Sequence, residues 1–221
     1  MQKLLLLLIL LPFFSWSQDT KQKEVLFSDA VGKHIKTYKK KARKAYRHKD
    51  YERAQILFDS LVNHQLRGTY LDNFKVSCVR TGKTYFNDFK KPMYLMTYAS
   101  WCVASKGEVQ SLNTLAKKYK KEIDFVVLFW DKRKQARRVS RKYNRFVHVL
   151  YVDELSNREA HLVKTMKHSL GLPTTFYISQ DKEILGIEHL PKPHIEQDIK
   201  NAVQFNAQQF KKGVQVLLAS P

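Results

Sequence analysis

The sequence predicts an α/β fold, and three stretches of the chain carry that prediction. Residues 92–119 join a short apolar and aromatic run to a pattern in which apolar residues recur every three or four positions, as in a helix. Residues 123–130 form a nearly continuous apolar run, as expected for an inner strand that is covered on both faces. Residues 174–178 and 183–187 form two further apolar segments around a polar turn, which predicts a closing hairpin. Strands and helices in this order indicate an α/β domain.

A cysteine lies at the junction of the strand and the helix in the first of these stretches. The helical face consists of Val109, Leu112, Leu115, Ala116 and Tyr119. This pattern places Cys102 at a helix N-terminus, where unpaired N–H groups and aligned peptide dipoles favour a thiolate. We therefore expect the pKa of Cys102 to lie below the ordinary thiol value of about 8.5. The junction is predicted to be a site of sulfur chemistry.

Two segments resemble signatures of one superfamily. Trp101-Cys102-Val103-Ala104-Ser105, followed by Lys106 and Glu108, resembles the active-site segment of the thioredoxin superfamily, in particular its redoxin-type, TlpA-like extracytoplasmic thiol-disulfide oxidoreductases. The family pattern is a hydrophobic strand, Trp-Cys-x-x-Cys, and a helix that opens with a basic residue and a Glu. Leu170-Gly-Leu-Pro-Thr-Thr-Phe-Tyr-Ile178 resembles the strand that carries the cis-proline of the superfamily, at Pro173. The resemblance covers roughly residues 71 to 210 and implies a thioredoxin-like fold, with a central mixed sheet flanked by helices.

The resemblance also implies roles for individual residues. Cys102 would be the nucleophile, and Pro173 would pack beside it. Leu172 would offer backbone groups to an incoming peptide, and Trp101 would shape the rim of the groove. A cis Leu172–Pro173 bond is expected, with an ordinary trans turn as the alternative.

Three positions depart from the family pattern. Ser105 stands in place of the second cysteine, Met96 in place of a buried acid, and Gln110 in place of a proline that bends the helix in many relatives. The first two losses agree, because a buried proton acceptor has little use where there is no second thiol. Ser105 could still donate a hydrogen bond to the thiolate, and Lys106 could add positive charge.

Two functions follow from these residues. The first is a monothiol oxidoreductase or isomerase that forms mixed disulfides through Cys102 with protein or small-molecule thiols and disulfides. The second is a thioredoxin-fold binding module that has lost catalysis. No cofactor is expected, and the scattered histidines lack metal-ligand spacing, so no metal is expected either. A copper chaperone would need a second cysteine near Cys102, which this chain lacks. A peroxiredoxin would need Thr or Ser at position 99, where this chain has Ala99.

Residues 1–17 are predicted to be a secretory signal peptide. Lys3 supplies the positive charge, residues 4–14 the apolar stretch and residues 15–17 a small-x-small cleavage site. The apolar stretch is shorter than the ~18 to 20 residues that span a bilayer. No cysteine near the cleavage site could carry a lipid anchor. The mature protein is therefore placed outside the cytoplasm, in a bacterial periplasm.

The mature chain is predicted to divide into a helical extension, residues 18–70, and a thioredoxin-like domain, residues 71–221. Apolar spacing predicts one helix near residues 28–48 and a second helix that Asp50 caps, with Gly68 ending the unit. We expect this helical hairpin to pack on the domain, with partner recognition as the alternative. Alternating residues 73–79, the turn Thr81-Gly82 and residues 84–86 predict an N-terminal β-hairpin.

Cys78 is the other of the two cysteines in the chain. It shares one side of an early strand with Phe74 and Val76, where a cysteine usually acts as a small core residue. A disulfide between Cys78 and Cys102 is the alternative in an oxidising compartment.

The chain is strongly basic, with 40 Lys and Arg against 20 Asp and Glu and a formal charge of +20. Residues 132–145 hold eight basic residues and no acid, which predicts a surface helix with a positive outer face. For a secreted chain we exclude nucleic acid as the partner. A generally basic, solvated surface is expected, and docking to an anionic membrane surface or an acidic protein is the alternative. The oligomeric state does not follow from the sequence.

Overall fold

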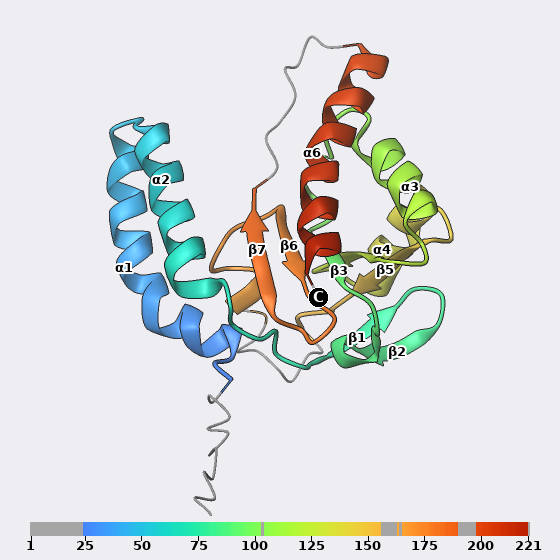
Figure 1. The fold of residues 1–221 in the computed structure, drawn as a ribbon, viewed down its shortest axis with the longest axis horizontal. Coiled ribbons are helices and arrows are strands. Elements are labelled where there is room, and N and C mark those ends of the chain that lie inside the picture. The colour runs from blue at the N-terminus through green and yellow to red at the C-terminus, as the bar shows by residue number, and fades with distance from the viewer. Residues whose placement is uncertain (1–23, 103, 156–162, 164, 190–197, 221) are drawn as a thin grey trace, which may run out of the picture.

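The computed structural model describes residues 24–102, 104–155, 163, 165–189 and 198–220 (Figure 1). The predicted signal peptide lies outside the described residues. So does most of residues 156–167, for which the sequence predicts a helix. The described strands form one seven-stranded sheet in the order β2-β1-β5-β4-β3-β6-β7. Their bounds are β1 (Lys75–Cys78), β2 (Gly82–Tyr85), β3 (Met93–Tyr98), β4 (Asp124–Phe129), β5 (Val147–Tyr151), β6 (Thr174–Ile178) and β7 (Ile184–Glu188).

The sheet is mixed, as predicted. Strands β3, β4 and β5 pair in parallel, whereas β6, β7, β1 and β2 join by antiparallel pairing. The N-terminal hairpin is confirmed, because β1 pairs with β2 through a turn that ends at Gly82, whose φ of +91° favours glycine. The central strand β3 lies between β4 and β6, and its six residues are all buried.

Three helices cover one face of the sheet: α3 (Glu108–Lys118), α4 (Arg133–Ser140) and α6 (Ile199–Ala219). The connections β3-α3-β4 and β4-α4-β5 step across the sheet in the same direction, so right-handed crossovers place both helices on the same face. Alternate residues of β3, namely Tyr94, Met96 and Tyr98, point into the core on this face.

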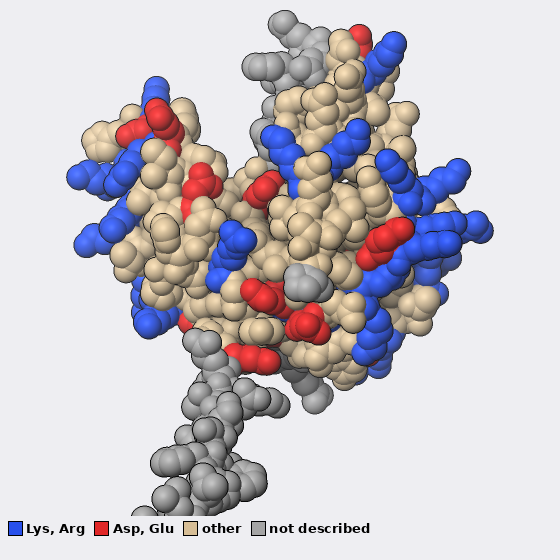
Figure 2. All heavy atoms as spheres, viewed as in Figure 1, with Lys and Arg blue, Asp and Glu red and all other residues tan. Residues whose placement is uncertain are grey.

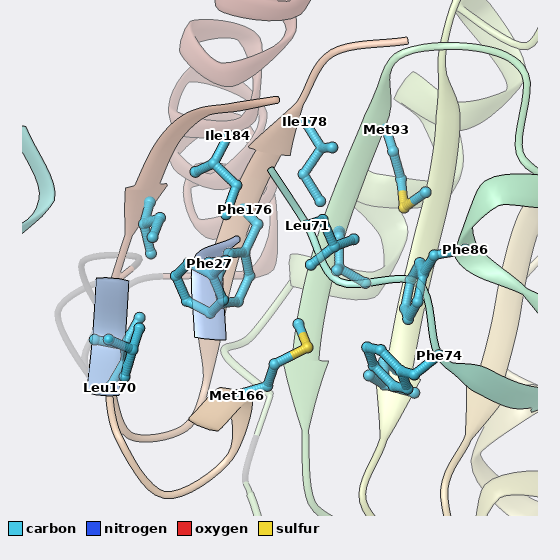
Figure 3. Packing of buried hydrophobic residues seen from close by; sticks show 14 of the residues in the cluster. Phe27, Leu71, Phe74, Phe86, Met93, Met166, Leu170, Phe176, Ile178 and Ile184 are labelled. Atoms are coloured by element: carbon cyan, nitrogen blue, oxygen red, sulfur yellow. The ribbon is translucent and has the colours of Figure 1, made fainter. Parts of the chain in front are cut away.

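The helical hairpin packs at the opposite face, as expected. It consists of α1 (Phe27–Arg47) and α2 (Tyr51–Leu61), followed by a π-helical turn, η1 (Val62–Leu66). Phe27 at the start of α1 meets Phe176 of β6 edge to face, with ring centroids 5.7 Å apart (Figure 3). The predicted cap is present, because Asp50 accepts a hydrogen bond from the Arg53 backbone N–H at 2.9 Å. A 3-10 turn, η2 (Phe86–Asp88), follows the β-hairpin and adds Phe86 to the same core.

The chain after α2 joins this hairpin to the edge of the sheet. Gly68, with a φ of +82°, donates its N–H to the Ile184 carbonyl at 2.9 Å, and Ile184 donates back to Thr69 at 2.7 Å. The base of the hairpin is therefore continuous with β7. Its outer turns stand apart from α6 in Figure 1.

For the last helix, apolar spacing predicts residues near 194–210, with Ile195, Ile199, Ala202 and Val203 facing inward. The helix instead continues to Ala219, and Ile199 is 50% exposed; Ile195 lies outside the described residues. The buried stripe instead runs through Ala202, Asn206, Phe210, Gly213, Val214 and Leu217. Gly213 lies inside this helix and does not end it. Its missing side chain leaves room for the ring of Tyr177.

We expect Gly213→Ala to destabilise the fold. A Cβ at this position would lie 2.2 Å from Cε1 of Tyr177, a ring that is 1% exposed and wedged beside Tyr94. Relieving such an overlap in a packed core costs about 1 to 3 kcal/mol, more than the helix propensity that alanine gains. Urea denaturation at neutral pH would measure the change in the free energy of unfolding.

The matched control is Gly32→Ala in α1. A Cβ there meets nothing within 4 Å, so alanine should stabilise the helix by about 0.5 to 1 kcal/mol. Equal effects of the two substitutions would show that the contact with Tyr177 does not govern the last helix.

Candidate thiol site

Cys102 lies beyond the carboxyl end of the central strand β3, four residues after that strand ends at Tyr98. Its backbone N–H donates to the Ala99 carbonyl at 2.9 Å, which closes a tight turn. The Ala99 N–H in turn points at the thiol, 3.4 Å from Sγ. The side chain is half-buried and packs against the core beneath α3 and α6. A backbone N–H donated to sulfur favours the charged thiolate over the thiol.

The pairing of β3 with β6 brings the two sequence signatures together. Thr97 pairs with Thr174, and the Thr97 hydroxyl donates to the Thr174 carbonyl at 3.1 Å. Continuing this antiparallel register by two steps places Pro173 opposite Tyr98 and Leu172 opposite Ala99. The Ala99 N–H contacts Cys102, so the cysteine turn and the proline loop lie side by side. The Leu172–Pro173 peptide bond is cis.

The residues that were expected to bind substrate lie at this end of the sheet. Trp101 is 69% exposed, which is unusual for so large an apolar side chain. Leu172 and Pro173 are half-buried. An indole exposed beside a thiol gives an incoming apolar group something to pack against.

The predicted helix N-terminus at Cys102 is wrong. Helix α3 begins at Glu108, six positions further on, and its N-cap is Gly107. Gly107 has a φ of +78°, and a Cβ there would lie 2.8 Å from the backbone nitrogen of Val203 in α6. Close packing against α6 thus leaves room only for glycine at this position, and the left-handed backbone of this glycine precedes the start of the helix. The dipole of α3 falls off within its first turn, so it does not act on Cys102 as predicted.

Ser105 makes its hydrogen bonds with buried groups beneath the site. Its N–H and its hydroxyl lie 2.7 and 2.8 Å from Oε2 of Glu108, and the hydroxyl also lies 3.1 Å from Oδ1 of Asn206. The Asn206 amide donates to the Lys106 and Ala202 carbonyls at 2.9 and 2.8 Å. These contacts occupy the Ser105 hydroxyl, which was expected to donate to Cys102. Lys106 itself is exposed.

A buried carboxylate is present, although not where the family pattern has one. Met96 is 1% exposed and entirely apolar, whereas Glu108 is 7% exposed and accepts a hydrogen bond from the Tyr98 hydroxyl. Burial, and then the neighbouring charge of Glu108, raise the pKa of Tyr98 well above its ordinary value. Tyr98 therefore remains a neutral donor to this carboxylate.

The sequence alone did not predict the hydrogen bonds that join Ser105, Glu108 and Asn206. One signal was available, because Ser-x-x-Glu at residues 105–108 is the pattern of a capping box, in which the glutamate accepts from the serine backbone N–H. Asn206 lies about a hundred residues away along the chain. Its only sequence signal is a polar residue at an apolar position of the last helix.

Asp131 is a second residue that sequence reasoning missed. It follows β4, and its two carboxylate oxygens accept from the N–H and hydroxyl of Ser100 at 2.5 and 2.7 Å. Because Ser100 precedes Trp101 and Cys102, this bidentate contact fixes the start of the cysteine turn.

The alternative of a disulfide between Cys78 and Cys102 is excluded. Cys78 is 7% exposed in β1 and belongs to the core on the face of α1, so its predicted core role is confirmed. Cys102 follows β3, three strands away in the sheet order, and packs on the other face. Three strand spacings amount to roughly 14 Å, whereas a disulfide needs Cα atoms within about 7 Å.

Among the described residues, no group of three or more His, Cys, Asp or Glu side chains could hold a metal ion. His189 stacks on Phe58 of α2, and its Nε2 lies 2.8 Å from the Leu170 carbonyl. Burial lowers the pKa of His189. His161 and His194 lie outside the described residues.

Comparison with known proteins supports the fold through structure alone. No protein-family model and no curated protein matches the chain. A structure named for the thiol:disulfide interchange protein DsbE of Chlorobium tepidum has a TM-score of 0.52 at 19% identity, covering 69% of this chain and 98% of that one. The thioredoxin domain of a Bacteroides vulgatus thiol-disulfide oxidoreductase has a TM-score of 0.50 at 12% identity, covering 66% and 96%. A conserved protein from Geobacillus kaustophilus gives 0.51 at 16% identity, covering 71% and 84%.

The chain therefore has a thioredoxin-like fold. The predicted α/β class, with a mixed sheet flanked by helices and a helical N-terminal extension, is confirmed. Within the part that the structure describes, no helix is both long enough and apolar enough to cross a membrane.

The network beneath the site should contribute measurably to stability. Glu108→Gln replaces one of the two carboxylate oxygens by an NH2 group, which cannot accept a hydrogen bond. The remaining oxygen cannot accept from both Tyr98 and Ser105. Leaving buried donors unsatisfied should lower the free energy of unfolding by about 1 to 3 kcal/mol, measured by urea denaturation.

Glu122→Gln is the control, because Glu122 is exposed and its loss should change stability by no more than about 0.5 kcal/mol. A double-mutant cycle of Glu108→Gln with Tyr98→Phe should show coupling between the two residues. Additive effects would mean that the buried pair is not an energetic unit.

Proposed function

We propose that this protein is an extracytoplasmic monothiol oxidoreductase or isomerase that exchanges disulfides through Cys102. The observation that carries the proposal is the meeting of a half-buried thiol and a cis-proline loop at one edge of a thioredoxin-like sheet. Trp101 stands exposed beside them as a surface for substrate.

The reaction begins when the Cys102 thiolate attacks one sulfur of a substrate disulfide. The S–S bond of the substrate breaks, Cys102 forms a mixed disulfide with one half, and the other half leaves as a thiolate that takes a proton from water. In a protein with two active-site cysteines the second thiol would then break the mixed disulfide. Here Ser105 occupies that position, so another thiol must do so.

The source of that thiol decides the outcome. If a second thiol of the substrate attacks its own sulfur in the mixed disulfide, a rearranged disulfide forms and Cys102 is released as a thiolate, which is isomerisation. If two external thiols attack in succession, the substrate leaves reduced and the external thiols leave as a disulfide. Both routes conserve electrons without a cofactor.

The proposed location rests on the amino-terminal pattern of residues 1–17 and on the chemistry itself. Disulfides persist in oxidising compartments outside the cytoplasm, so an enzyme that exchanges them is placed there, in a bacterial periplasm. The DsbE name of a structural neighbour agrees with this chemistry.

A binding module without turnover is the second candidate, and one observation favours it. The position of the missing thiol is filled by a hydroxyl that is committed to Glu108 and Asn206, so the site beneath Cys102 is built as a structural network. Such a protein would hold a partner in the proline groove and release it without exchange.

We expect the native protein to accumulate mixed disulfides with cell-envelope proteins, and Ser105→Cys to reduce that accumulation several-fold. A thiol at position 105 supplies the missing intramolecular exit. Non-reducing gels after acid quenching, followed by mass spectrometry of the adducts, would measure the trapped fraction.

Two variants serve as controls for this experiment. Ser105→Ala supplies no thiol and should trap as the native protein does, whereas Cys102→Ala should trap nothing. If native protein and Cys102→Ala give the same adducts, the exchange function is wrong and the binding module remains.

A further inference from the structure

Helix α4 and its flanks carry an unusually uniform positive surface. Eight cationic side chains, all exposed, occur in fourteen residues, and no acid follows until Asp153. We call this surface the α4 basic face, made of Lys132, Arg133, Lys134, Arg137, Arg138, Arg141, Lys142 and Arg145. Figure 2 shows Lys and Arg gathered along the side on which α3 and α4 lie in Figure 1.

This arrangement works against the stability of α4. Arg133, Arg137 and Arg141 follow one another at steps of four residues, and so do Lys134, Arg138 and Lys142. Like charges at that spacing destabilise a helix by about 0.2 to 0.5 kcal/mol per pair. Cations in the first turn also oppose the helix dipole, and that turn contains no acid. A helix selected only for solubility would mix the two signs.

Within the part of the chain that the structure describes, no ion pair includes a cation of the α4 basic face. The ion pairs found there join Asp124 or Glu154 to Lys and His residues outside the α4 basic face. A surface hollow is lined by Gln135 together with five of the cations, Arg133, Lys134, Arg137, Arg138 and Arg141. The face is therefore available to an external anionic group.

The α4 basic face begins beside the thiol. Strands β3 and β4 are parallel, so both end at the edge that carries Cys102, and Trp130 donates its N–H to the Tyr98 carbonyl at 2.9 Å. Asp131 then binds Ser100, and Lys132 is the next residue. Eight helical residues span about 12 Å, which is longer than the Debye length of about 8 Å at physiological salt. The charges at the start of α4, next to Asp131, therefore act most strongly on groups that approach the thiol.

The chemistry of the face fits an acidic polypeptide better than a membrane. A helix that lies on a bilayer inserts an apolar side among the lipids. The apolar residues of this segment, Ala136, Val139 and Tyr143, instead pack into the core beneath the sheet. Five of the eight cations are arginines, whose planar fork binds carboxylates and phosphates alike, so the absence of an exposed apolar side is what decides against a membrane.

We propose that the α4 basic face recruits acidic protein substrates and steers their disulfides to Cys102. This inference rests on the proposed exchange function, and it adds the substrate class. A polypeptide with Asp or Glu residues close to its disulfide would dock on the helix while its sulfur reaches Cys102, beside Trp101 and the Pro173 loop.

The test uses two synthetic peptides with the same single-cysteine core, each activated as a thiopyridyl disulfide, one flanked by four Glu and the other by four Gln. Attack by Cys102 on the peptide sulfur forms a mixed disulfide and releases thiopyridone, which absorbance follows; Cys102→Ala gives the blank. We expect the Glu peptide to react about tenfold faster at low salt, with the difference lost at high salt.

The diagnostic variant is Arg133→Gln with Arg137→Gln and Arg141→Gln, which should lose most of the preference for the Glu peptide. Its matched control is Lys36→Gln with Lys40→Gln and Lys44→Gln, three exposed cations at the same spacing on α1, which should keep it. Circular dichroism would verify that both variants fold.

The remaining outcomes are distinguishable. Equal rates for the two peptides, or a preference that survives the α4 substitutions, would overturn the inference while leaving exchange intact. It would also be overturned if those substitutions abolished sedimentation with phosphatidylglycerol vesicles but left the peptide rates unchanged. Uncharged dithiodipyridine reports on the thiol alone, so its failure to react at Cys102 would reject the exchange function itself.

Discussion

Antiparallel pairing between β3 and β6 is the constraint on which the site depends. It places the cysteine turn and the proline loop, far apart in sequence, at one edge of the sheet. The pairing is secured from both sides, because β3 is fully buried between β4 and β6 and its alternate residues reach the cores of both faces. Without this register the thiol and the proline loop would not lie next to each other.

The fold could be predicted because its signals are local. A short, mostly apolar strand segment, a glycine at a left-handed turn position and an aspartate before a helix act over a few residues, and each produced the expected element. The start of α3 could not be predicted in this way. It depends on the contact of Gly107 with Val203, which lies almost a hundred residues away, and helical periodicity reports only the face that is buried.

The same distinction separates the parts of the site. Cys102, Trp101 and Pro173 belong to contiguous motifs and are found where the motifs place them, at one edge. The groups beneath them are non-local, because Asp131 comes from the end of the neighbouring strand and Asn206 from the last helix. Met96 stands where the family pattern has a buried carboxylate. Glu108 supplies one from the helix, and a count of family positions does not reveal it.

The structural use of both carboxylates has a consequence for catalysis under the proposed function. The oxygens of Asp131 bind Ser100, and those of Glu108 bind Tyr98 and Ser105, so both groups hold the turn in place. A second active-site thiol would resolve the mixed disulfide intramolecularly, with the advantage of a high effective concentration. Without it, each turnover requires at least one further reaction with a thiol that is not part of the protein. A basic face that retains an acidic substrate beside Cys102 keeps the substrate's own thiols close to the mixed disulfide, which favours rearrangement over loss of the half-reacted chain.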